Sequence, residues 1–101
     1  MAKQAEQNKT RVVYRAWPNG DIIALFPQIP ADNRGYLCSS YEHIGQHGAA
    51  NPDIVVSKTS YVSSLFPELQ KELEEIGYVL EVGQICTTFD RKQRQKAALQ
   101  N

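Results

Sequence analysis

The sequence contains no apolar run long enough to cross a membrane and no excess of charge of either sign. Its longest continuous apolar stretch covers residues 22–26, far shorter than the roughly 20 residues that a membrane-spanning helix needs. Eleven Lys and Arg balance eleven Asp and Glu, so no overall field draws the chain to nucleic acid or to a lipid surface. We therefore expect neither a membrane nor a nucleic acid as its partner.

Cysteine is scarce, and the two positions do not suggest redox chemistry. Residues 1–10 are polar and lack the apolar core of a secretory signal, which predicts a disordered N-terminal tail and a cytoplasmic protein. In that reducing compartment Cys38 and Cys86 are expected to stay free. They are not spaced as a Cys-x-x-Cys pair, so we interpret both as small apolar side chains and expect no cofactor.

A β-hairpin is the first predicted element. Residues 11–17 are rich in β-branched and aromatic types, and residues 22–26 form the returning strand. Asn19-Gly20 favours a two-residue type I′ turn, which places Trp17 opposite Ile22.

In this register Arg15 lies opposite Ala24 and Val13 opposite Phe26, while Tyr14 lies on the other face. Both faces of the hairpin are apolar. One is expected to pack on a helix, and the other on a second layer, a second copy of the chain or a ligand.

The rest of the chain predicts further strands and one helix. Residues 36–41 resemble a third strand, 42–53 an irregular loop, and 54–57 a short strand or extended connection. Leucines recur at helical spacing from residue 65 to 73 and predict an amphipathic helix that ends before Gly77. Residues 78–82 then form a final strand.

These elements predict an α+β fold with one domain at residues 11–89, between the N-terminal tail and a basic tail at 90–101. The domain is expected to hold a small antiparallel sheet, made of the N-terminal hairpin and two or three further strands, covered by one amphipathic helix. Because a domain of this size buries a modest fraction of its surface, we expect a homodimer or higher oligomer.

The polar segment 39–53 is the predicted functional site, and it contains both histidines. Its glycines allow main-chain N–H groups to approach an anion, while the imidazoles and an amide add donors and acceptors. The predicted ligand-binding residues are Ser40, Tyr41, His43, Gly45, Gln46, His47 and Gly48.

Other interpretations of this segment stay open. The glycines would also suit a purely structural loop whose polar side chains tie its own carbonyls together. A metal site or a small hydrolase would use His43 and His47, assisted by Ser40, Glu42 or Asp53. The sequence has neither the His-Glu-x-x-His pattern nor a nucleophile elbow, so we predict no metal and no catalytic residue.

Arg15 and Trp17 form a second candidate surface, because they share one face of the predicted hairpin. An arginine beside an aromatic ring is typical of a contact with a partner. The alternative is that the arginine stem packs over the ring at the margin of the sheet.

Three segments carry a resemblance to a known family: 15–27, with Gly20-Asp21-Ile22-Ile23-Ala24-Leu25-Phe26-Pro27, then 40–50, with Gly45-Gln46-His47-Gly48, and 76–82. They resemble a family of short uncharacterised proteins of bacterial, phage and mobile-element genomes. The resemblance brings no activity and no residue roles. It implies a small accessory protein that binds a host defence protein or sequesters a nucleotide signal.

The resulting hypothesis is a small non-enzymatic binding module that engages a host protein or a small anionic ligand. The alternative is a small hydrolase or metal-dependent enzyme that uses His43 and His47.

Overall fold

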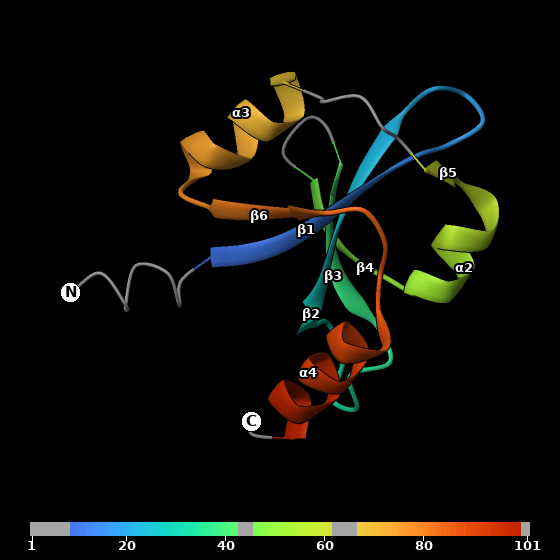
Figure 1. Ribbon diagram of the computed structural model, residues 1–101, viewed down its shortest axis with the longest axis vertical. Helices are drawn as coiled ribbons and strands as arrows, with labels where there is room; N and C mark the ends of the chain where they lie inside the picture. Colours follow the sequence, from blue (N-terminus) through green and yellow to red (C-terminus); the bar gives the residue numbers. More distant parts are fainter. Residues whose placement is uncertain (1–8, 43–45, 62–66, 100–101) are drawn as a thin grey trace.

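The computed structural model describes residues 9–42, 46–61 and 67–99. They form an α+β domain with one mixed sheet and three helices (Figure 1). Chain order is β1 (Lys9–Ala16), β2 (Ile22–Pro30), β3 (Cys38–Glu42), β4 (Gln46–Ala50), α2 (Pro52–Lys58), β5 (Ser60–Tyr61), α3 (Pro67–Ile76), β6 (Val79–Gly83) and α4 (Thr88–Leu99). Among the described helices, none is long and apolar enough to cross a membrane.

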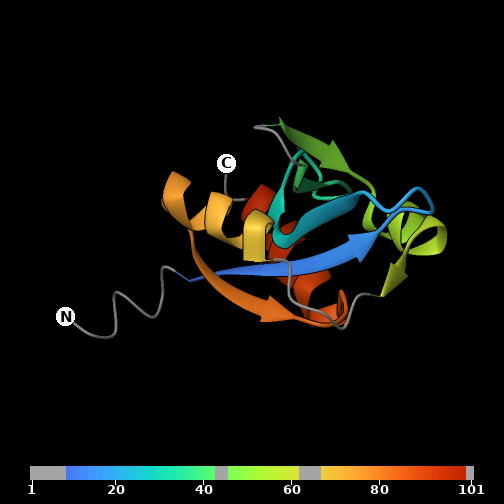
Figure 2. The same cartoon turned by 90° about the horizontal axis from the view of Figure 1, so that it is seen from above.

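The sheet has the strand order β4-β3-β2-β1-β5, and β6 also pairs with β1. The outer side of β1 is therefore shared by two strands. Its second half pairs antiparallel with β5, while residues 9–13 pair parallel with β6. The expectation of a purely antiparallel sheet is therefore wrong. After α3 the chain returns so that β6 runs in the same direction as β1 (Figure 2).

Each face of the sheet has its own core. On one face, Phe26 and Tyr41 pack with Leu69 and Leu73 of α3. On the other face, Leu25 and Cys38 pack with Val55 of α2. Each face of the hairpin thus packs on a helix of the same chain. Two helices, α2 and α3, contact the sheet where the sequence predicted one.

The predicted helix is confirmed as α3, with Pro67 in its first turn. It ends at a glycine, as the sequence predicts. Gly77 has a φ of 126°, and its N–H donates to the carbonyls of Leu73 and Glu74. This is a left-handed C-terminal cap, which glycine adopts without steric cost.

The hairpin is confirmed, but its predicted register is wrong by one residue. Arg15 pairs with Ile23 rather than Ala24. The N–H of Trp17 donates to the carbonyl of Asp21, and among the described residues only glycines, Gly20 included, have positive φ. The turn therefore has a three-residue loop that ends in a left-handed glycine. Asn19 stays out of the left-handed region and uses its side chain to accept the Asp21 N–H at 3.0 Å.

Other expected boundaries also move. β1 already begins at Lys9, inside the expected tail. The segment 42–53 is not an irregular loop throughout, because its described part contains β4. Residues 54–57 lie in α2, which begins after an Asn51 N-cap and Pro52.

The expected C-terminal tail is instead the packed helix α4. Asp90, Arg94 and Ala98 are buried at successive helical turns. Arg94 donates from Nη1 to the carbonyl of Pro27 at 2.8 Å and from Nε to that of Gly35 at 2.7 Å. The domain therefore extends beyond residue 89 and includes the whole of α4 (Figure 1).

Candidate functional site

The predicted polar segment is divided between the two faces of the sheet. β3 pairs antiparallel with β4, so that Ser40 lies opposite Gly48 and Tyr41 opposite His47. Directly opposite residues share a face, and successive residues alternate between faces. Ser40 and Gly48 consequently lie on the α2 side of the sheet, while Tyr41 and His47 lie on the α3 side.

On the α3 side, aromatic side chains hold His47. The His47 ring meets the Tyr41 ring edge-on at a centroid distance of 4.7 Å, and its Nε2 lies 3.0 Å from the Tyr78 hydroxyl. Tyr78 in turn stacks on Phe26 at 5.0 Å. His47 therefore joins β4 to the residue that leads into β6.

Tyr41 connects the same cluster to α3. Its ring is buried, and its hydroxyl donates to a carboxylate oxygen of Glu72. These contacts position α3 over the sheet. The imidazole of His47 and the phenol of Tyr41 thus have structural contacts of their own, as the structural-loop interpretation of this segment expects.

On the α2 side, an open hollow of about 290 Å³ lies between α2 and the strands β2, β3 and β4. It is lined by Trp17, Ile23, Ser40, Glu42, Val55 and β4 residues 47–50. Because the β4 lining residues after His47 are glycine and alanine, the strand main chain lies close to the open space. This hollow, which we call the α2 hollow, is the best candidate site in the described part of the chain.

The α2 hollow brings together some of the predicted residues and leaves out others. Ser40, Gly48 and Trp17 line it, and so does His47, although its imidazole contacts Tyr41 and Tyr78 on the other face. Tyr41 is not part of the lining. His43 and Gly45 lie outside the described residues. Gln46 is described only by its main chain, which pairs with Glu42 at the start of β4.

Arg15 does not belong to a surface that a partner can reach, which corrects the second candidate surface. Its side chain is buried, and Nη2 donates to the carbonyls of Val56 and Thr59 at 3.0 and 2.7 Å. Nε donates to the Thr59 hydroxyl at 2.8 Å. The guanidinium therefore fixes the end of α2 to β1, and Trp17 alone remains accessible from this pair.

The sequence interpretation missed the contribution of α2 to the site. Val55 reaches the hollow because Asn51 caps the helix, accepting the N–H groups of Asp53 and Ile54 at 3.0 and 3.3 Å. Asn-Pro is a start signal for a helix, since proline is favoured in the first turn. The Asn51-Pro52 dipeptide could therefore have predicted helix α2, which contributes Val55 to the hollow.

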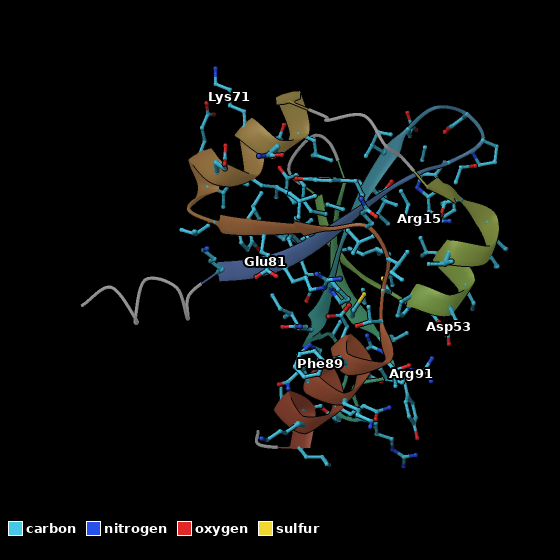
Figure 3. The ribbon with its side chains drawn as sticks, in the orientation of Figure 1. Arg15, Asp53, Lys71, Glu81, Phe89 and Arg91 are labelled. Carbon is cyan, nitrogen blue, oxygen red and sulfur yellow. The ribbon has the colours of Figure 1, made fainter. Side chains whose placement is uncertain are left out.

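A second hollow of about 270 Å³ lies between α2 and α4, lined by Tyr36, Asn51, Asp53, Arg91, Arg94 and Gln95. Its two arginines are already occupied. Arg91 pairs with Asp53 at 3.2 Å, and Figure 3 labels these two residues on α4 and α2. Arg94 donates to main-chain carbonyls. An anion would have to displace Asp53 to bind there.

The strongest electrostatic cluster of the described chain is structural. Asp90 is buried and accepts from Arg11 Nε at 2.9 Å, from Gln28 at 2.9 Å and from the Thr87 N–H at 2.9 Å. Burial by itself raises the pKa of Asp90, but these donors outweigh it and hold that pKa below its usual value. The carboxylate is therefore a fixed negative charge that ties α4 to β1 and β2.

Neither cysteine is activated. Burial raises the pKa of the Cys38 thiol to about 12, and burial together with the charge of Asp90 raises that of Cys86. A thiol that stays protonated is a poor nucleophile. In the described residues, His, Cys, Asp and Glu side chains form no group of three or more that could hold a metal ion.

No family model matches the chain, and comparisons with curated proteins and with solved structures give no match. The function has to be inferred from the geometry of the α2 hollow and the surfaces around it.

Proposed function

We propose that this protein is a small binding module that takes up a basic side chain of a partner protein in the α2 hollow. The observation that carries the proposal is the hollow itself, with Trp17 at its margin and the small residues of β4 along one side. About 290 Å³ is at the lower end of the range for ligand sites. It suits one protruding side chain better than a large cofactor.

The chemistry of the lining favours a cation. Glu42 supplies a carboxylate and Ser40 a hydroxyl, whereas no Lys or Arg is among the described residues that line the hollow. The face of an indole also attracts cations, so Trp17 adds to the preference for Lys or Arg. In view of the resemblance to mobile-element proteins, we propose that the partner is a host protein.

A small anionic ligand has less support at either hollow. A phosphate in the α2 hollow would meet the carboxylate of Glu42 without a cationic side chain from the lining. In the second hollow it would compete with Asp53 for Arg91. We therefore favour a protein partner over the sequestered nucleotide that the sequence also suggested.

The hydrolase alternative gains no support from the described residues. Ser40 and His47 belong to neighbouring strands but lie on opposite faces of the sheet. Asp53 pairs with Arg91 instead of approaching an imidazole. His43 lies outside the described residues.

The proposal is tested by the fluorescence of Trp17, because Trp17 is the single tryptophan of the chain. The probes are a short arginine-containing peptide and the same peptide with glutamate in place of arginine. We expect the arginine peptide to shift the Trp17 emission in a saturable way and the glutamate peptide to leave it unchanged. Equal responses to both peptides would exclude selective recognition of a cation.

Gly48→Val is the blocking variant. A Cβ at Gly48 would lie 3.4 Å from Ser40 Oγ, so the first carbon fits, and the branched methyl groups extend into the hollow. Valine is also favoured in strands, so the fold should be retained and the peptide response lost. The matched control is Tyr78→Phe, which removes the His47 contact on the opposite face and should leave the response intact.

A further inference from the structure

The edge strand β6 carries exposed apolar side chains. Val79 is 53% exposed and Val82 48%, and Ile85, just beyond the strand, is 61% exposed. β6 pairs with β1 on one side, and no described strand pairs with its other side. Figure 2 shows β6 at the outer side of β1. An edge of this kind presents unpaired main-chain donors and acceptors and favours pairing with another strand.

The faces of the sheet do not offer an equivalent surface. α3 covers one face, and α2 covers part of the other. The sequence alone offered a second layer, a second copy of the chain or a ligand as the cover of one hairpin face, and α2 of the same chain covers part of that face. Among the described strand residues, the most exposed large apolar side chains are Val79 and Val82 of β6.

We propose that a second copy of the chain binds here, its β6 pairing antiparallel with the first β6 about a two-fold axis at Val82. Such pairing joins the two sheets into one and satisfies the free main-chain groups of both edge strands. The two Val82 side chains then lie directly opposite each other.

Charge favours this register over one centred on Glu81. Centring the two-fold axis on Glu81 would place two carboxylates directly opposite each other, which is destabilising. Centring it on Val82 places Glu81 of one copy opposite Gly83 of the other. The Arg11 guanidinium lies over Gly83, since a Cβ at that glycine would be 2.5 Å from its atoms. The carboxylate of one copy thus meets the guanidinium of the other.

Arg11 has capacity for this contact. Its Nε is held by Asp90, and its Nη2 donates to the carbonyl of Ile85 at 3.0 Å. Its Nη1 lies 3.9 Å from Glu81 of its own chain, longer than a hydrogen bond, so Nη1 is the nitrogen that can reach the carboxylate of the other copy. The absence of a side chain at Gly83 leaves the guanidinium room above the strand. The same register brings Val79 of one copy towards the exposed Ile85 that follows β6 in the other copy.

The first experiment measures the mass of the full chain by sedimentation over a range of concentrations. We expect a reversible dimer, and Val82→Lys should weaken it by about tenfold or more because two ammonium groups face each other. Val56→Lys is the matched control, since Val56 is an exposed valine on α2, away from β6. A monomer at every concentration, or a dimer that tolerates Val82→Lys, would overturn the proposal.

The second experiment tests the register with cysteine pairs in a Cys86→Ala chain, oxidised by glutathione disulfide. Directly opposite residues of an antiparallel pair are close enough for a disulfide, so Val82→Cys should give a covalent dimer and Glu81→Cys should not. The reverse result would show a register centred on Glu81 and contradict the charge argument. Gly48→Val should not change the mass, so a failure of the α2 hollow as a binding site and a failure of the dimer are distinguishable.

Discussion

Three charged side chains are buried in the described part of this small domain, and each reaches another element. Arg15 fixes α2 to β1, Asp90 ties α4 to β1 and β2, and Arg94 bonds to carbonyls beside β2. A buried charge is costly unless it is paired or fully hydrogen-bonded. These residues therefore determine how the helices dock as much as the apolar core does.

Asp90 makes the stability of the protein dependent on acid. Its pKa is lower in the folded chain than in the unfolded chain, so the unfolded chain takes up the proton first as the pH falls. The contribution of Asp90 is present above about pH 4 and is lost as the pH falls below that value, through the folded pKa. Urea unfolding at a series of pH values measures this loss.

Asp90→Asn should lower the free energy of unfolding at neutral pH by about 3 kcal/mol, because Arg11 loses its charged partner. It should also reduce the acid-dependent part of the curve. Asp53→Asn is the control: the Arg91–Asp53 pair is exposed and should contribute less than about 1 kcal/mol. Equal effects of the two substitutions would show that the buried network has no special role.

At this scale, the sequence predicts apolar burial but not polar burial. The positions of Leu69 and Leu73 follow from helical spacing and are confirmed in the core. Asp90 and Arg94 are buried at the same kind of spacing, but their side chains are those expected at a solvated surface. Their burial depends on partners up to 79 residues away in the chain, which no local pattern reveals.

The N-terminus of α4 carries a signal that the sequence interpretation did not use. Thr87 and Asp90 form a reciprocal capping box: the Thr87 hydroxyl accepts the Asp90 N–H at 3.0 Å, and Asp90 accepts the Thr87 N–H at 2.9 Å. This pattern predicts a helix start where the charge pattern suggested a tail.

Thr87→Ala should therefore destabilise the protein by about 1 kcal/mol, because the Asp90 N–H loses its acceptor. Thr88→Ala is the matched control: it changes the same residue type at the next position, which is exposed. Thermal unfolding followed by circular dichroism compares the two variants. A larger shift for Thr88→Ala would contradict the assignment of Thr87 as the N-cap.

Local chemistry also explains which strands could be predicted. β1, β2 and β6 are rich in β-branched and aromatic residues and were predicted from that composition. β4 contains glycine and alanine and depends on the ladder with β3, so its composition indicates a loop. In the hairpin, Asn-Gly indicated a turn, while the side chain of Asn19 decided between two- and three-residue loops.

On the scale of the whole molecule, part of the candidate site could be predicted from the sequence, but the fold divides the predicted residues between the two faces of the sheet. Ser40, His47, Gly48 and Trp17 do line one hollow, but the imidazole of His47 bonds to Tyr78 on the other face. Alternation along β3 and β4 separates these groups, and alternation could not be applied while the segment was interpreted as a loop. Helix α2 was missing because residues 54–57 were interpreted as a short strand or extended connection.

The final prediction concerns α4 as an integral part of the domain. Gly35 has a φ of +74°, and a Cβ there would lie 2.8 Å from the Gln95 Cα in α4. Gly20 also has a positive φ, of +95°, but a Cβ there would meet nothing within 4 Å. Gly20→Ala should therefore cost about 1 kcal/mol, from backbone strain alone.

Gly35→Ala should cost a further 1–3 kcal/mol or so, because main-chain atoms of α4 have to move away. The difference between the two variants, measured by urea unfolding, isolates the contact between the 31–37 loop and α4. If residues 90–99 behaved as a solvated tail, the helix would yield and the two glycine variants would unfold at the same urea concentration. Separate midpoints, with Gly35→Ala the less stable, are expected because Arg94 anchors α4 to the carbonyl of Gly35 itself.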